Sequence, residues 1–213
     1  MIHDVINLGT EDLELIATAL GVKEEVNYEE LKSTLLDKID ADWGKYVEQY
    51  FSIKTPSSDK LLFTEFKFNE AQQLAVTAIN KGVDVTEILK WRQEGITNLL
   101  AAFAVIKAVI KPRTVLIYCP TGQLKRDFCE KVYIFALQYA HKTPCAIVDR
   151  RILDSGVEFH NGSEIKIINH IEACRGFRAD YIIVDEIGFI KNSAEVVDTL
   201  RGCLNDGGQF IYF

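Results

Sequence analysis

Two adjacent carboxylates, Asp185 and Glu186, directly follow the uninterrupted apolar run of residues 181–184. Such a run is typical of a strand buried on both faces, as in a parallel sheet. Open α/β sheets bind ligands at the carboxyl ends of their strands. In that position one carboxylate can hold a magnesium ion while the next orients an attacking water molecule. The alternative interpretation is a strand that ends in a solvated acidic turn.

A second candidate site spans residues 90–97, Lys-Trp-Arg-Gln-Glu-Gly-Ile-Thr, between a predicted strand and a predicted helix. This is the position of the Walker A phosphate loop, whose strict pattern is G-x-x-x-x-G-K-[ST]. Gly95 and Thr97 match its second glycine and its hydroxyl, but Lys90 replaces the first glycine and Ile96 replaces the lysine. Gly95 permits a tight turn, N–H groups at the helix start can face phosphates, and Thr97 can reach Mg²⁺.

The missing lysine charge must come from elsewhere, and Lys90 and Arg92 are near enough in the loop to supply it. On the residues alone, the alternative is an ordinary turn between a strand and a helix. The loop residues predicted to bind nucleotide are Lys90, Arg92, Gln93, Glu94, Gly95, Ile96, Thr97 and Asn98.

Together these motifs resemble the large terminase subunit of tailed bacteriophages, over residues 61–213. In that family the basic residue of the phosphate loop is often moved to the early part of the loop, and Arg-Gln-x-Gly-x-Thr at 92–97 shows this displacement. Phe68-x-x-x-Gln72 resembles its adenine-contacting Q motif, with Gln73 as the alternative register. The remaining matches are Val-Glu-Phe-x-Asn-Gly-Ser-x-Ile at 157–165, Arg-Gly at 175–176 and Val-Asp-Glu at 184–186.

The resemblance implies an ATP-driven motor that packages double-stranded DNA into a capsid. Thr97 and Asp185 would hold Mg²⁺, Glu186 would position the hydrolytic water, and Gln72 would read adenine.

The resemblance also assigns roles to the basic residues. Lys90 or Arg92 would contact the β- and γ-phosphates, and Arg92 joins Glu186 as a predicted catalytic residue. Arg175 or Arg178 is a candidate charge sensor or arginine finger, with pairing to local carboxylates as the alternative.

The resemblance further implies partners and a location. A ring of subunits would act at the procapsid portal vertex in the host cytoplasm, with the portal protein and a small terminase subunit. The family continues past the position of Phe213 into a coupling motif and then a nuclease domain. The sequence is therefore expected to be the ATPase part only, a fragment or a split form, without nuclease activity.

Two other functions fit parts of the pattern. One is half of a superfamily 2 helicase-like ATPase, a family that normally shows Gly-Lys-Thr in the loop and has a second motor domain. The other is a hydrolysis-defective P-loop scaffold or adaptor, suggested by Ile96. Magnesium-dependent ATP binding separates a competent motor domain from the adaptor.

Strands alternate with helices along the chain, which predicts a RecA/ASCE-like P-loop fold, a mostly parallel sheet flanked by helices. A hairpin is expected at 156–168, with Asn161-Gly162 as its turn. Further strands are expected at 83–89, 114–119, 146–149, 181–184 and 209–213, and helices at 74–80, 99–110, after 122 and at 194–204.

The 213 residues carry a net charge of −7, and the charge is uneven. Residues 1–60 hold 13 acidic and 6 basic side chains, whereas the remainder holds 18 of each. An acidic segment favours a protein partner over DNA phosphates. Helices predicted at 10–21, from Asn27 and around 43–51 precede a linker-like stretch. The predicted domains are therefore a helical module at 1–54, a linker at 55–60 and the ATPase domain at 61–213. The alternative for residues 1–54 is a lid that only covers one face of the ATPase domain.

The five cysteines are scattered without metal-ligand spacing, which is typical of reduced core thiols in a cytosolic protein. No apolar run reaches the length of a membrane span, and the N-terminus has no basic segment of a secretory signal. The sequence therefore predicts no membrane partner.

Overall fold

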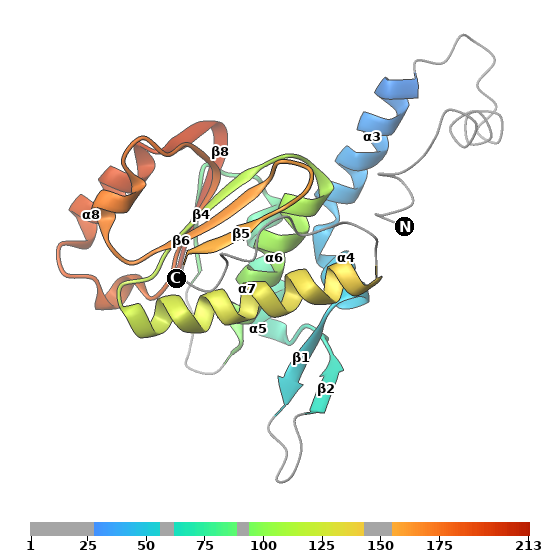
Figure 1. The fold of residues 1–213 in the computed structure, drawn as a ribbon, viewed down its shortest axis with the longest axis horizontal. Coiled ribbons are helices and arrows are strands. Elements are labelled where there is room, and N and C mark those ends of the chain that lie inside the picture. The colour runs from blue at the N-terminus through green and yellow to red at the C-terminus, as the bar shows by residue number, and fades with distance from the viewer. Residues whose placement is uncertain (1–27, 56–61, 89–93, 143–154) are drawn as a thin grey trace.

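The computed structural model describes residues 28–55, 62–88, 94–142 and 155–213 (Figure 1). The predicted helix at 10–21, the predicted strand at 146–149 and the loop residues Lys90, Arg92 and Gln93 lie outside these ranges. They stay predictions.

A six-stranded sheet forms the centre of the molecule, in the order β3-β8-β7-β4-β6-β5. The first five strands are parallel, and β5 at the far edge runs antiparallel. Strand β8 lies between β3, which precedes the candidate phosphate loop, and β7, which precedes Asp185, as in RecA/ASCE-like P-loop sheets. The predicted fold class is confirmed. The strands are β3 (Val85–Glu87), β4 (Thr114–Tyr118), β5 (Gly156–Glu158), β6 (Glu164–Ile168), β7 (Ala179–Val184) and β8 (Leu204–Tyr212).

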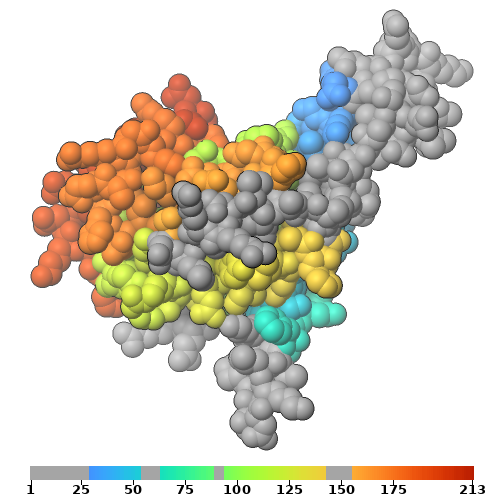
Figure 2. Space-filling view, viewed as in Figure 1, coloured from blue at the N-terminus to red at the C-terminus, as the bar shows by residue number. Residues whose placement is uncertain are grey.

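Successive side chains of each strand enter two different cores, because they point to opposite faces of the sheet. Val115 and Ile117 of β4 join the core beneath α6 and α7, whereas Leu116 and Tyr118 join the core beneath α8. Helix α7 runs across the front of the molecule in this view, and α8 lies at the left, on the opposite face of the sheet from α6 (Figures 1 and 2). The covering elements are α5 (Glu70–Asn80), α6 (Ile96–Ile110), α7 (Gly122–Lys142), α8 (Ser193–Arg201) and the 3₁₀ turn η2 (Ile171–Cys174).

Helix α6 is the most deeply buried element, with 13 of its 15 residues in the interior. It is apolar all round because it lies between the sheet and four other helices, α3, α4, α5 and α7. In the described part of the chain, no helix combines the length and the apolar character that crossing a membrane requires. The helix starts at Ile96, one turn earlier than the predicted 99, and ends before Pro112.

The N-terminal helices pack on α6 and share its core. Fully buried Trp43 meets the ring of Phe103 edge-on, with 4.8 Å between the ring centroids. A two-stranded antiparallel hairpin then projects from the body (Figure 1). The predicted helical module is thus built against the α/β part, while the division into domains at 54 and 60 stays a prediction. These elements are α3 (Tyr28–Ala41), α4 (Trp43–Tyr50), β1 (Ser52–Thr55) and β2 (Leu62–Glu65).

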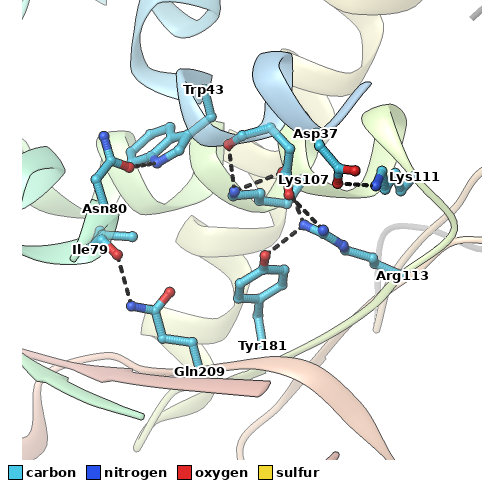
Figure 3. A network of polar contacts seen from close by, with 10 residues as sticks. Asp37, Trp43, Ile79, Asn80, Lys107, Lys111, Arg113, Tyr181 and Gln209 are labelled. Carbon is cyan, nitrogen blue, oxygen red and sulfur yellow. Dashed lines mark hydrogen bonds and ion pairs between the residues drawn. The ribbon is translucent and has the colours of Figure 1, made fainter. Parts of the chain in front are cut away.

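A network of largely buried charges, with side chains 8–18% exposed, joins α3 to the amino edge of the sheet (Figure 3). The Asp40 carboxylate accepts a hydrogen bond from Lys107 Nζ at 2.7 Å and two from the Arg113 guanidinium at 2.6 and 3.0 Å. Arg113 also donates to the Tyr181 hydroxyl at 2.6 Å. Burial raises the pKa of Tyr181 to about 12, so this hydroxyl stays neutral. We call these four residues the amino-edge network.

Two boundaries near the C-terminus correct the sequence prediction. Helix α8 ends at Arg201 rather than 204, and β8 begins at Leu204 rather than 209. Parallel pairing with β7 starts early, with Ala179 opposite Leu204, and then shifts register so that Tyr181 lies opposite Gln209. The intervening Asn-Asp-Gly-Gly sequence consists of residues that are rare in strands, so the sequence pattern does not indicate a strand there. Strand β3 is also shorter than the predicted 83–89, whereas the hairpin of β5 and β6 is confirmed.

Candidate nucleotide-binding site

The five parallel strands end in register at one edge of the sheet. The N–H of Asp185 donates to the Tyr118 carbonyl, and the N–H of Ile88 donates to the Tyr212 carbonyl, both at 2.9 Å. The chain therefore leaves β3 toward the phosphate loop from the same edge at which β7 reaches Asp185. Two strand spacings, about 10 Å, separate these exits. The last aligned row of the sheet is Glu87, Tyr212, Val184, Tyr118 and Ile168.

Asp185 is buried at this carboxyl edge, with 1% of its surface exposed. Burial raises the pKa of the Cys119 thiol, and the negative charge of Asp185 raises it further. A carboxylate at this position suits Mg²⁺, which proteins hold through one or two carboxylates together with substrate phosphates. Within the described ranges, no group of three or more His, Cys, Asp or Glu side chains is arranged to hold a metal.

Glu186 follows in a left-handed conformation, with φ 53° and ψ 52°. The chain turns sharply here into a short 3₁₀ segment, η3 (Ile187–Phe189). Two backbone bonds hold the turn, from Ile187 N–H to the Phe213 carbonyl at 2.8 Å and from Phe189 N–H to the Glu186 carbonyl at 3.0 Å. A non-glycine residue pays about 1–2 kcal/mol for this conformation. Such strain is concentrated at functional positions in proteins.

Gly95 occupies the N-cap of α6 in the left-handed region, at φ 71°. No side chain caps the first turn of the helix. An added Cβ at Gly95 would stand 2.9 Å from Nε2 of Gln72, so this position requires glycine for both conformation and space. A long helix with backbone N–H groups at such a start is a favourable place for a phosphate group.

The three predicted site residues in the first turn of α6 have different surroundings. The Ile96 side chain is 2% exposed and packs in the core, so only its backbone N–H can serve a ligand. Thr97 is half-buried at the helix start. Asn98 lines a different groove, of about 260 Å³, together with Ile53 of β1 and Phe135 of α7.

Gln72 is buried against Gly95, at the end of the candidate phosphate loop, rather than exposed. It is 4% exposed, and its Nε2 donates to the Gly95 carbonyl at 3.1 Å. Its Oε1 accepts from the backbone N–H of Asn69 at 3.0 Å, while Asn69 Nδ2 donates to the Glu94 carbonyl at 3.0 Å. Sequence reasoning missed Asn69, although its spacing of three from Gln72 is that of a capping box. Gln73, the alternative register, is exposed.

A groove of about 570 Å³ lies beside this loop, between α5 and the end of β3. Its floor is mostly aliphatic, and Asn69 and Glu94 stand where it meets the loop. The groove is large enough to hold a small ligand, and apolar pockets with a few polar groups are the usual form of such sites. Its other lining residues are Glu70, Ala71, Leu74, Ala75, Ala78, Glu87 and Ile88.

The two candidate arginine fingers, Arg175 and Arg178, lie between η2 and β7. Arg178 precedes β7 at the amino edge, and its Nη1 donates to the Gly202 carbonyl at 3.0 Å, where α8 ends. Arg175 is exposed just after η2. The six residues of β7 separate Arg178 from Asp185, so Arg178 is not brought to the carboxylates of its own chain.

Comparison with known proteins identifies the fold. The large terminase ATPase domain of a Thermus phage, P74-26, superimposes with a TM-score of 0.52 at 20% identity, covering 69% of this chain and 64% of that chain. The large terminase of bacteriophage HK97 gives a TM-score of 0.52 at 15% identity, covering 79% of this chain and 37% of that one.

This chain has the fold of a phage large-terminase ATPase domain. It spans less than two thirds of the length of each of these neighbours. No protein-family model matches the sequence, and no curated protein matches it. The large-terminase fold is therefore established by three-dimensional similarity, and it agrees with the resemblance that the motifs at 92–97 and 184–186 indicate.

Proposed function

We propose that this chain is the ATP-binding and ATP-hydrolysing part of a large terminase, which drives double-stranded DNA into a procapsid. The observation that carries the proposal is the common edge of the sheet. The left-handed Gly95 at the start of α6 and the successive carboxylates Asp185 and Glu186 leave the sheet at the same edge, with β8 between their strands.

The described residues fit a magnesium nucleotide. Asp185 and Thr97 would hold Mg²⁺, which neutralises charge that develops on the phosphates. The N–H groups of the first turn of α6 would bind phosphate oxygens. Lys90 or Arg92 would replace the positive charge that Ile96 cannot provide. The nucleoside would lie in the groove between α5 and β3.

Glu186 would orient the attacking water. Glu186 follows directly after the carboxylate proposed to hold the metal, and the chain turns there with φ 53° into the short segment η3. Water must be held in line with the bond that breaks, and a fixed carboxylate can do this by accepting its proton. Arg92 is the candidate for stabilising the transferred phosphoryl group.

The proposed assembly follows from the similarity to terminases. It comprises a homo-oligomeric ring at the procapsid portal vertex in the host cytoplasm, with the portal protein, a small terminase subunit and DNA as partners. A basic residue of a neighbouring subunit would complete each site, because Arg178 is held at the amino edge of its own chain.

Calorimetric titration with Mg-ATP tests the nucleotide site. We expect saturable binding that weakens at least tenfold in Asp185→Asn, because the metal loses its charged ligand. Of Lys90→Ala and Arg92→Ala, the variant that binds more weakly identifies the phosphate-binding cation. A folded chain that binds neither Mg-ATP nor Mg-ADP would contradict the proposal and favour the adaptor.

A further inference from the structure

The capping box of α5 makes contacts outside its own helix. Asn69 accepts from the Gln72 N–H at 2.9 Å, and Gln72 accepts from the Asn69 N–H at 3.0 Å, which together close the box. Each amide group has a donor end left over. Asn69 Nδ2 donates to the Glu94 carbonyl and Gln72 Nε2 donates to the Gly95 carbonyl.

We infer that Asn69 and Gln72 are positioning residues that fix the phosphate loop, and that Gln72 does not read adenine. We call the two donated bonds the loop clamp. Both accepting carbonyls immediately precede the first turn of α6, so the clamp sets the direction in which that turn presents its N–H groups. This inference rests on the proposed function, because it concerns how the same site binds phosphate.

The geometry of Gln72 opposes a role in base recognition. Reading adenine with a glutamine amide requires both its oxygen and its nitrogen to face the base. Here the oxygen is committed to Asn69, the nitrogen to Gly95, and the side chain is 4% exposed. The clamp also explains the close approach at Gly95, where Nε2 occupies the space that a Cβ would need.

Two isosteric variants remove the hydrogen bonds of the loop clamp and keep those of the capping box. Asn69→Asp keeps the oxygen that caps α5 but loses the donor to Glu94. Gln72→Glu keeps the oxygen that accepts from Asn69 but loses the donor to Gly95. Asp at the N-cap and Glu three residues later form a favourable capping box, so α5 remains intact in both. The melting temperature of Asn69→Asp, at an exposed position, should therefore stay within about 2–4 °C of the unaltered chain, whereas Gln72→Glu places a carboxyl group at a buried position and should melt lower. Binding by both variants is therefore compared well below either melting transition.

The decisive probes are Mg-ATP, Mg-GTP and inorganic tripolyphosphate, which has no base. Each variant should weaken the binding of all three ligands by a similar factor, about fivefold to tenfold, which is the effect of one lost hydrogen bond. The double variant should weaken all three further. Thr77→Glu, which adds a negative charge on the exposed face of α5, controls for electrostatic repulsion, and its smaller effect should vanish at high salt.

The outcomes distinguish the inference from the proposed function. A parallel loss for the nucleotides and tripolyphosphate supports the clamp. A loss confined to Mg-ATP, or no loss in either variant, overturns the clamp and leaves the nucleotide site standing. If the unaltered, folded chain binds none of the three ligands, the proposed function is overturned and the clamp with it.

Discussion

The two edges of the central sheet are held by different chemistry. At the amino edge, Asp40, Lys107 and Arg113 join α3 to the sheet through buried, charged hydrogen bonds. At the carboxyl edge, the neutral amides of Asn69 and Gln72 hold the phosphate loop through two backbone carbonyls. Removing one partner of a buried ion pair costs about 3–5 kcal/mol, whereas one neutral hydrogen bond contributes about 0.5–1.5 kcal/mol.

The contacts at the amino edge therefore contribute mainly to stability, and those at the carboxyl edge contribute mainly to the proposed nucleotide site. Breaking the amino-edge network costs more free energy, so this network holds α3 firmly to the sheet. The loop clamp is weaker, and it adds no charge beside the place proposed for a triphosphate.

The largest expected effect is on stability at the amino edge. Asp40→Asn leaves the buried Lys107 amine and the Arg113 guanidinium without their anion, so the free energy of unfolding should fall by about 3–5 kcal/mol. Urea-induced unfolding measures this loss. Asp37→Asn is the matched control, because the Asp37 side chain is 62% exposed where it pairs with Lys111, and its loss should stay below about 1 kcal/mol. Equal effects of the two variants would remove the distinction between the edges.

The next effect is on turnover at the carboxyl edge. Glu186→Gln should lower ATP hydrolysis by about a hundredfold or more, because an amide cannot accept the proton of the attacking water. Binding of Mg-ATP should change little. Phosphate release and calorimetry measure the two quantities in the same sample, and unchanged turnover would contradict the role of Glu186.

A smaller effect is expected at the start of α6. In Gly95→Ala, the alanine must adopt a left-handed conformation and its Cβ must displace the Gln72 side chain. Nucleotide affinity should therefore fall about tenfold, which is equivalent to about 1.4 kcal/mol. Gly207→Ala is the control, since Gly207 has a similar φ of 75° but open space around it. It should lose stability without losing affinity. Equal losses of affinity would show that strain alone, and not the clamp, is responsible.

The smallest effect is a pH dependence of the amino-edge network. Burial alone would raise the pKa of Asp40, but the hydrogen bond from Arg113 and the charge of Lys107 outweigh it and lower that pKa. A lowered pKa stabilises the folded chain above the unfolded value, about 4, and this contribution is lost as the pH falls through the folded value. The stability difference between Asp40→Asn and the unaltered chain should therefore be constant between pH 5 and 8 and narrow below pH 4. A difference that grows in acid would contradict this sign.

The sequence predicts most of the fold where the signal is local. The apolar run before Asp185, the Asn161-Gly162 turn and the Ala-rich α6 each contain their own signal within a few residues. The polar start of β8 could not be found this way, because its pairing with β7 depends on a register shift that only the assembled sheet specifies.

The candidate site was predictable in part for the same reason. The edge position of Asp185 follows from strand polarity. The loop pattern predicts the tight turn at Gly95, but not that α6 begins directly after it. The clamp of Gln72 on Gly95 and the pairing of Asp40 with Arg113 join residues 23 and 73 positions apart. No local pattern encodes such contacts. The burial of Ile96 also depends on which face of α6 meets the sheet.

Hydrogen exchange with and without a non-hydrolysable magnesium-ATP analogue tests the central claim most directly. We expect the analogue to slow exchange at the amides of residues 96–98 and 185–187, at the carboxyl edge. Amides 113–114 and 180–181, at the amino edge, should exchange at unchanged rates. Slowed exchange confined to the amino edge, or none at the carboxyl edge under saturating analogue, would contradict the assignment of the nucleotide site.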